Sequence, residues 1–181
     1  FAAGFDWTVN VIQSDQANAF ALPGGKMAVY TGLVPVAKNQ DGMAAVMGHE
    51  IAHALMRHGA QRMARGKLEQ IGQMAGAAGG MDAGTMQTVM SAYGVTSALP
   101  YARAHETQAD EVGLMLAAAA CFDPREAVPL WERMAQASGG QSPPEFASTH
   151  PSPETRIQHL QSLMPKALAF REKYCGTGGA P

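Results

Sequence analysis

The sequence contains no long apolar run and no concentration of charge of one sign. No stretch of about 18 consecutive residues is apolar, so the sequence predicts no membrane-spanning helix. The 13 Lys and Arg residues and the 15 Asp and Glu residues are scattered along the chain, and they leave a net charge of −2. The sequence therefore lacks a basic patch of the kind that binds nucleic acid, and we expect no nucleic-acid partner.

Cysteine is also scarce. Only Cys121 and Cys175 occur, without a Cys-x-x-Cys motif, and they fit a single disulfide and two buried thiols equally well. The chain begins with Phe1 rather than Met, so we expect a fragment or a processed form. A signal peptide or a membrane anchor, and any membrane association that it provides, would then lie upstream.

Strand-like segments come first in the chain, and helical segments follow. Residues 6–14, 18–25 and 26–34 alternate or are rich in β-branched residues, and they predict a small antiparallel sheet. Asp41 is the expected N-cap of a helix that continues to about Gly66. This order predicts an α+β fold that is mostly helical, with the small sheet packed on a helix bundle.

The length of the chain fits one domain. Its 181 residues, 46% of them hydrophobic, are enough to build one sizeable core. We therefore expect a single domain over residues 1–175. The glycine-rich end, residues 176–181, is expected to be a flexible tail.

The segment MGHEIAHALMRHG, residues 47–59, carries the pattern His-Glu-x-x-His at His49, Glu50 and His53. Helical residues four apart share a face, so both imidazoles can reach one metal ion while Glu50 lies beside it. The surrounding residues are apolar, and buried histidines without a shared partner would be costly. The pattern predicts a catalytic zinc site with Glu50 as its general base. His58 lies half a turn away from His49 and is expected to point elsewhere.

A catalytic zinc site needs a third protein ligand. A histidine six residues beyond His53 is not available, because position 59 is Gly. The segment AHETQADEVG instead offers Glu106 on a later helix, with Asp110 one turn further on the same face. Asp110 could accept a hydrogen bond from the free ring nitrogen of a ligand histidine and fix its tautomer.

His-Glu-x-x-His followed by Glu-x-x-x-Asp resembles the gluzincin metallopeptidases, and more narrowly the family of the CAAX prenyl endopeptidases and the HtpX heat-shock protease. The resemblance extends over NAFALPGGKMAVYTGLV, GHEIAHALMRHGAQR, ETQADEVGLMLAAAACFDPREAVPLWERM and STHPSPETRIQHL. It implies a gluzincin-like fold and a zinc endopeptidase that binds one Zn²⁺ per chain. The implied zinc ligands are His49, His53 and Glu106, and the implied base is Glu50.

The resemblance also suggests residues around the zinc. His150 lies where the family has a histidine near the active site, from which it could stabilise an oxyanion. Arg156 is expected to hold the local structure by pairing with a carboxylate such as Asp110. The segment NAFALPG is the expected edge strand that binds an extended peptide. The candidate substrate-binding residues are Asn18, Ala19 and Phe20.

The region between the two predicted zinc-binding helices departs from the membrane-embedded branches of this family, because it carries charges at Lys67, Glu69 and Asp82. We therefore expect the soluble or lipid-anchored bacterial branch, located in the periplasm or envelope. The expected partners are polypeptide substrates, and unfolded or misassembled envelope proteins fit better than a CAAX protein.

Two alternatives to an open protease remain. A chaperone-like client-binding or assembly factor could use the methionine-rich segment 63–90, although core filling is the favoured interpretation of those methionines. A latent protease could be covered by a mobile lid at residues 76–84, which are rich in glycine. Glu50 favours catalysis, because a pure binding protein needs no base at that position.

Overall fold

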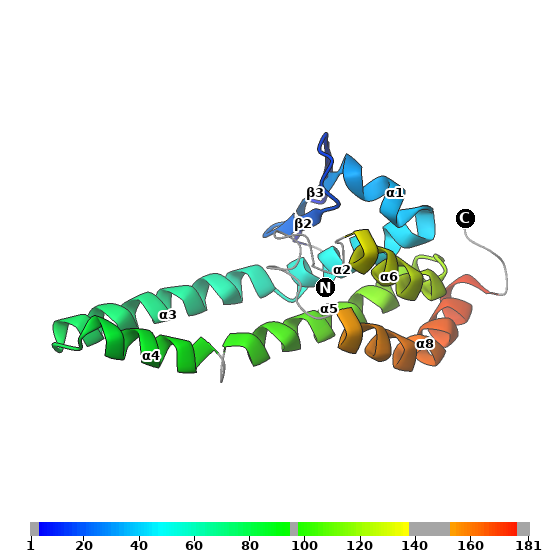
Figure 1. Ribbon diagram of the computed structural model, residues 1–181. Helices are drawn as coiled ribbons and strands as arrows, with labels where there is room; N and C mark the ends of the chain where they lie inside the picture. The colour runs from blue at the N-terminus through cyan, green and yellow to red at the C-terminus, as the bar shows by residue number, and fades with distance from the viewer. Residues whose placement is uncertain (1–3, 95–97, 138–152, 177–181) are drawn as a thin grey trace.

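The computed structural model in Figure 1 describes residues 4–94, 98–137 and 153–176. His150 and all but the first residue of the predicted tail, 176–181, lie outside the described residues. The strands are β1 (Thr8–Ile12), β2 (Ala19–Leu22) and β3 (Lys26–Tyr30). The helices are η1 (Thr31–Leu33), α1 (Val34–Ala37), α2 (Gln40–Leu55), α3 (His58–Ala78), α4 (Ala83–Tyr93), α5 (Leu99–Ala119), η3 (Pro124–Glu126), α6 (Ala127–Ala137) and α8 (Pro153–Cys175). The prediction of a mostly helical α+β fold is confirmed.

The sheet is mixed, so the prediction of an antiparallel sheet is wrong for one strand pair. Its strand order is β1-β3-β2. The turn at Gly24 and Gly25, both with positive φ, returns the chain from β2 into an antiparallel pairing with β3. β3 lies between β2 and β1, and it runs parallel to β1. This topology leaves β2 as an edge strand above α2, as expected for the segment NAFALPG (Figure 1).

Asn39 caps α2, and Asp41 does not. The Asn39 backbone is extended, and its side-chain Oδ1 accepts a hydrogen bond of 2.8 Å from the Gly42 backbone N–H. Asp41 lies in the first turn and accepts a 2.8 Å hydrogen bond from the backbone N–H of Asp123. Asp41 therefore ties the start of α2 to the turn that follows α5.

The predicted helix through Gly66 is interrupted after Leu55. Arg57 adopts a left-handed conformation with φ of 57°, and α3 starts at the next residue in a new direction. A left-handed residue cannot continue a right-handed helix. Positions beyond Arg57 are therefore not related to the metal-binding motif by simple helical counting.

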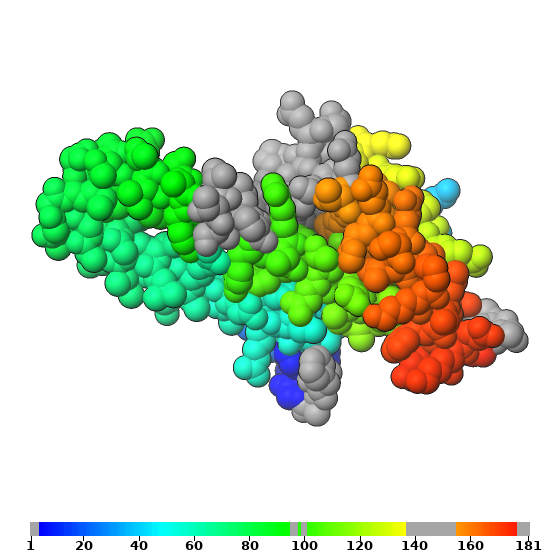
Figure 2. Space-filling view, turned by 90° about the horizontal axis from the view of Figure 1, so that it is seen from below, coloured from blue at the N-terminus to red at the C-terminus, as the bar shows by residue number. Residues whose placement is uncertain are grey.

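α3 and α4 form a helical arm that extends beyond the rest of the molecule (Figures 1 and 2). Met63 is 64% exposed and Met74 is 73% exposed, so core filling is the wrong interpretation for these methionines. They stay exposed because α4 packs against only one side of α3, through residues such as Met86. Residues 76–84 form the turn at the far tip of the arm, so they are not placed to act as a lid (Figure 1).

No helix in the described part of the chain is both long enough and apolar enough to cross a membrane.

The core lies where α2, α5, α6 and α8 pack together under the sheet. The backbones of α2 and α5 meet at Gly48 and Gly113. A Cβ atom on Gly113 would lie 2.6 Å from the backbone N of His49, and one on Gly48 would lie 2.6 Å from the carbonyl O of Gly113. Only glycine at both positions allows this approach. Large side chains that fill the surrounding core are Leu33, Val46, Leu114, Leu130, Trp131, Met134 and Leu160.

A disulfide closes the C-terminal side of this core. Cys121, just after α5, is bonded to Cys175 at the end of α8, with 5.5 Å between their Cα atoms. Of the two alternatives that the sequence leaves open, the structure therefore has the bonded one. α8 continues through Pro165, which is exposed to solvent.

Substituting Gly113→Ala should destabilise the protein although alanine is the better helix former. The new methyl group would collide with the His49 backbone, so we expect a loss of about 1–3 kcal/mol in the free energy of unfolding. Urea denaturation of the metal-free protein measures this loss.

The matched control is Gly66→Ala in α3, where nothing lies within 4 Å of the added Cβ atom. Here helix propensity acts alone, and we expect unchanged stability or a gain of up to about 1 kcal/mol. Equal changes in the free energy of unfolding at Gly113 and Gly66 would contradict the conclusion that Gly113 is needed for the close approach of α2 and α5.

Candidate metal centre

His49, His53 and Glu106 come together beneath the sheet, the histidines from α2 and the glutamate from α5. All three are buried. The two Nε2 atoms lie 3.0 Å apart, and Glu106 Oε2 is 3.3 Å from Nε2 of His49. Glu106 Oε1 is 3.2 Å from Nε2 of His53. One ligand atom from each residue thus faces a common point.

This donor set fits a zinc ion. Tetrahedral zinc with bonds of about 2.1 Å separates neighbouring ligand atoms by about 3.4 Å, close to the distances between these three side chains. Two imidazoles and one carboxylate leave a fourth position open, which is typical of catalytic zinc. The grouping is also costly without a cation, because it places a carboxylate and two imidazoles in the core.

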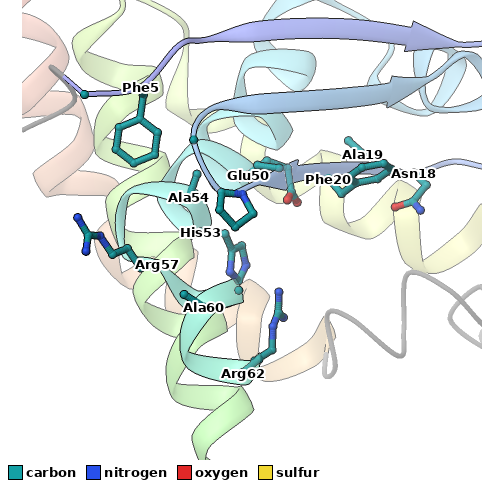
Figure 3. Close-up of a pocket in the computed structure, with 15 residues that line it drawn as sticks. Phe5, Asn18, Ala19, Phe20, Glu50, His53, Ala54, Arg57, Ala60 and Arg62 are labelled. Atoms are coloured by element: carbon teal, nitrogen blue, oxygen red, sulfur yellow. The ribbon is translucent and has the colours of Figure 1, made fainter. Parts of the chain in front are cut away.

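Glu50 is buried beside this cluster, on the same turn of α2 as His49. Burial raises the pKa of its carboxyl group above the ordinary value, and the nearby carboxylate of Glu106 adds to the rise. Figure 3 shows Glu50 and His53 on the wall of the same cleft. A carboxyl group with a raised pKa at a cleft is well suited to exchange protons near neutral pH.

Asp110 connects His49 to α8. Its Oδ1 lies 3.0 Å from Nδ1 of His49, while Arg156 donates to both carboxylate oxygens at 2.7 and 2.8 Å. When Nε2 of His49 faces a metal, Nδ1 carries the hydrogen and donates it to Asp110. Although burial opposes ionisation, the charge of Arg156 and the hydrogen bond from His49 lower the pKa of Asp110. Asp110 and Arg156 therefore lie where the sequence placed them.

Trp131 of α6 completes this side of the cluster, and it was not predicted from the sequence. The Arg156 guanidinium lies 3.6 Å from the centre of the indole ring, a cation–π contact. The same indole meets the His49 ring at 5.6 Å in an edge-to-face arrangement. Trp131 thus shields both side chains from water.

His58 supports His53, so the expectation that it points away is wrong. Its Nδ1 lies 2.9 Å from Nδ1 of His53, and its Nε2 lies 3.0 Å from Oε1 of Gln108. The turn at Arg57 carries His58 back under the motif, where it is fully buried. With Nε2 of His53 facing the metal, Nδ1–H of His53 donates to His58, which donates in turn to Gln108.

His105 stacks on His58 with ring centres 4.0 Å apart and nearly parallel planes. Burial lowers the pKa of His105 to about 4, and the neighbouring His58 and Arg62 also disfavour its protonation. His105 is therefore neutral at physiological pH. The stack holds the His58 ring in place, so His105 is more than a bystander although it does not face the metal position.

The two metal-facing histidines differ in their affinity for protons. Burial lowers the pKa of His53 to about 4, so this imidazole stays neutral. Burial and Arg156 also oppose protonation of His49, but the hydrogen bonds to Asp110 and Glu106 outweigh them and raise its pKa. A metal must therefore displace a proton mainly from His49.

A cleft of about 670 Å³ opens between the sheet and the start of α3, beside Glu50 and His53 (Figure 3). Asn18, Ala19 and Phe20 all line it, as expected for the edge strand. Arg57 and Arg62 also line this cleft, although neither was predicted from the sequence. Their position depends on the turn between α2 and α3, which carries no recognisable sequence signal.

The sequence model of Peptidase family M48 matches residues 2–164. The chain is 41% identical over 167 residues to mitochondrial metalloendopeptidase OMA1 of Schizosaccharomyces pombe, covering 92% of this chain and 49% of that protein. It is 34% identical over 180 residues to metalloendopeptidase OMA1, mitochondrial, of Homo sapiens, covering 92% and 34%. It is 31% identical over 159 residues to the β-barrel assembly-enhancing protease of Escherichia coli (strain K12), covering 81% and 32%.

These comparisons correct the predicted location. The relatives from fission yeast and human are named as mitochondrial, and both match at higher identity than the Escherichia coli protease. The prediction of a bacterial periplasmic or envelope location is therefore wrong, and the comparisons do not specifically support the expected bacterial branch. The chain spans about half the length, or less, of these curated relatives.

Replacing His58 should weaken metal binding from outside the ligand set. His58→Phe keeps the ring stack on His105 but cannot accept the hydrogen from His53, so we expect zinc affinity to fall about 10–100-fold. Titration against a competing chelator measures this change. The control is His105→Phe, which preserves the stack without touching His53 and should change zinc affinity far less. Equal losses would mean that packing alone explains the effect.

Zinc affinity should also depend on pH through His49. The raised pKa of His49 means that protons begin to compete with the metal above the ordinary histidine range. Between about pH 8 and pH 6 we expect affinity to fall, approaching about tenfold per pH unit once His49 is protonated in the metal-free protein. Chelator competition at several pH values tests this, and a constant affinity over that range would refute it.

Proposed function

The chain belongs to peptidase family M48, and from this premise we propose that it is the catalytic domain of a zinc-dependent metalloendopeptidase. The observation that carries the proposal is the meeting of His49, His53 and Glu106 beside a buried Glu50 at the wall of a cleft. The names of the relatives from fission yeast and Escherichia coli, a metalloendopeptidase and a protease, support the same activity.

In this proposal His49, His53 and Glu106 hold one Zn²⁺ per chain, which supplies Lewis acidity at the scissile carbonyl. Glu50 takes the proton of the attacking water and later passes it to the leaving amine. Its raised pKa suits this double role, because the carboxylate then takes up a proton more readily than that of an ordinary glutamate. Asp110 fixes the His49 tautomer, and Arg156 holds Asp110 ionised.

We propose that the substrate is an extended polypeptide that pairs with the free edge of β2. Asn18, Ala19 and Phe20 lie along this edge in the cleft that contains Glu50. Only an unfolded or locally extended chain can add as a strand there. Unfolded or misassembled proteins are therefore the proposed substrate class. His150, outside the described residues, keeps its proposed role as the oxyanion donor.

We also propose that residues 1–175 act as one domain. The disulfide between Cys121 and Cys175 fixes the end of α8 to the end of α5. The same α8 supplies Arg156 to the metal cluster. The last helix is thus part of the catalytic unit.

A client-binding role is the second candidate, because the arm exposes apolar side chains. Met63, Ile71 and Met74 are all more than 60% exposed along α3. Flexible methionine side chains adapt to many partners. This role does not need Glu50, so one substitution separates the two candidates.

Glu50→Gln should abolish peptide hydrolysis while leaving the metal in place. The substitution keeps the size of the side chain but removes the group that accepts the proton, and we expect activity to fall at least about 10²–10⁴-fold. Elemental analysis for zinc and hydrolysis of casein, each for wild type and variant, measure both properties.

One zinc per chain in both proteins, with casein cleaved only by the wild type, would support the proposed function. Zinc in both without cleavage by either would instead favour the client-binding candidate. Full activity in Glu50→Gln would exclude Glu50 as the base.

A further inference from the structure

Two arginines in the cleft indicate what the substrate carries close to the scissile bond. The cleft that contains Glu50 and His53 continues along the start of α3, where Arg57 and Arg62 line it. Figure 3 shows these arginines on either side of the first turn of α3. We propose that this part of the cleft binds an acidic side chain of the substrate polypeptide, with Arg57 and Arg62 as the recognising groups. The inference rests on the proposed peptidase function and deepens it.

The charges in the cleft are unbalanced. Among the described residues that line it, Glu50 is the only acidic one, and its proposed task is proton transfer. The ion pairs found among the described residues do not include Arg57 or Arg62. Both residues are exposed to solvent. The cleft therefore presents permanent positive charge to its contents, because an arginine does not lose its proton in proteins.

The backbone at Arg57 strengthens this argument. Its φ of 57° is a conformation that glycine or asparagine adopts at lower cost, by about 1 kcal/mol or more. The chain thus keeps a long cationic side chain at a position where the backbone favours another residue. α3 begins at the next residue, and the start of a helix adds partial positive charge to the same region.

A carboxylate is the chemistry that fits this region. The planar guanidinium group of arginine matches the two oxygens of a carboxylate in a bidentate contact. The other cleft residues near these arginines, including Phe5, Ala54 and Ala60, are apolar and suit the aliphatic stem of Glu or Asp. The proposed substrate is therefore an extended polypeptide with Asp or Glu within a few residues of the scissile bond.

Peptide binding to zinc-loaded Glu50→Gln tests the inference without requiring cleavage. The probes are fluorescein-labelled peptides with amidated C-termini, in which one Glu or one Gln is moved along an otherwise constant sequence. At one position of the peptide, or at two adjacent positions, we expect the Glu peptide to bind about tenfold more tightly than the matching Gln peptide at low salt. Arg57→Gln and Arg62→Gln should each reduce this preference, and the double variant should abolish it.

Lys67→Gln is the matched control. Lys67 is exposed on the same helix outside the cleft, and its substitution removes the same net charge. It should leave the Glu preference unchanged. An equal loss in Lys67→Gln, or no preference for Glu at any position, would overturn the inference. Arginine-dependent binding only of otherwise identical peptides made with a free C-terminal carboxylate would also overturn it, since the cleft would then bind a chain end.

Cleavage of the same peptides by the wild type separates this inference from the proposed function. Cleavage without any preference for Glu or Asp would leave the peptidase function intact and overturn acidic recognition. Arginine-dependent binding of the Glu peptides without cleavage would uphold acidic recognition and overturn the peptidase function.

Discussion

The backbone contact between α2 and α5 is the constraint on which the site depends. Zinc ligands on separate helices can converge only when the helix axes are close enough for short side chains to meet. The paired glycines Gly48 and Gly113 provide that approach, and Gly48 directly precedes His49 in the chain. The separations of 3.3 Å between Glu106 Oε2 and Nε2 of His49 and of 3.2 Å between Glu106 Oε1 and Nε2 of His53 follow from this crossing.

The crossing also buries charge, and α8 supplies the main compensation. An ionised Asp110 in the core would be unfavourable without a partner. Arg156 pairs with both of its oxygens and rests on Trp131, so α8 and α6 together hold this carboxylate of α5. The environments of Asp110 and Glu50 thus shift the pKa values of the two carboxyl groups in opposite directions. The arginine keeps Asp110 ionised to orient His49, while burial keeps Glu50 ready to accept a proton.

Interactions within one helix were predictable from the residue spacing, whereas contacts between separate elements, such as the one between Arg156 and Asp110, were expected only where the family resemblance suggested them. His49 and His53 share a face because they are four residues apart, and the same spacing relates Glu106 to Asp110. The parallel pairing of β1 with β3 was not predictable, because alternation shows that a segment is a strand but not which neighbour it joins. The cap at Asn39 was missed because Asp41 is an equally good capping residue by type. The exposed Met74 shows that composition does not say which apolar residues face the core.

One left-handed residue accounts for most of what sequence reasoning missed at the site. Had α2 continued through Arg57, His58 would lie far around the helix from His53 and would point away from the metal-binding motif, as predicted from the sequence. The turn instead brings His58 under His53, where it accepts the hydrogen that fixes the ligand tautomer. The same turn starts α3 at the mouth of the cleft, which places Arg57 and Arg62 beside the bound peptide of the proposed mechanism. A single change of direction therefore supports the metal on one side and gives the cleft its charge on the other.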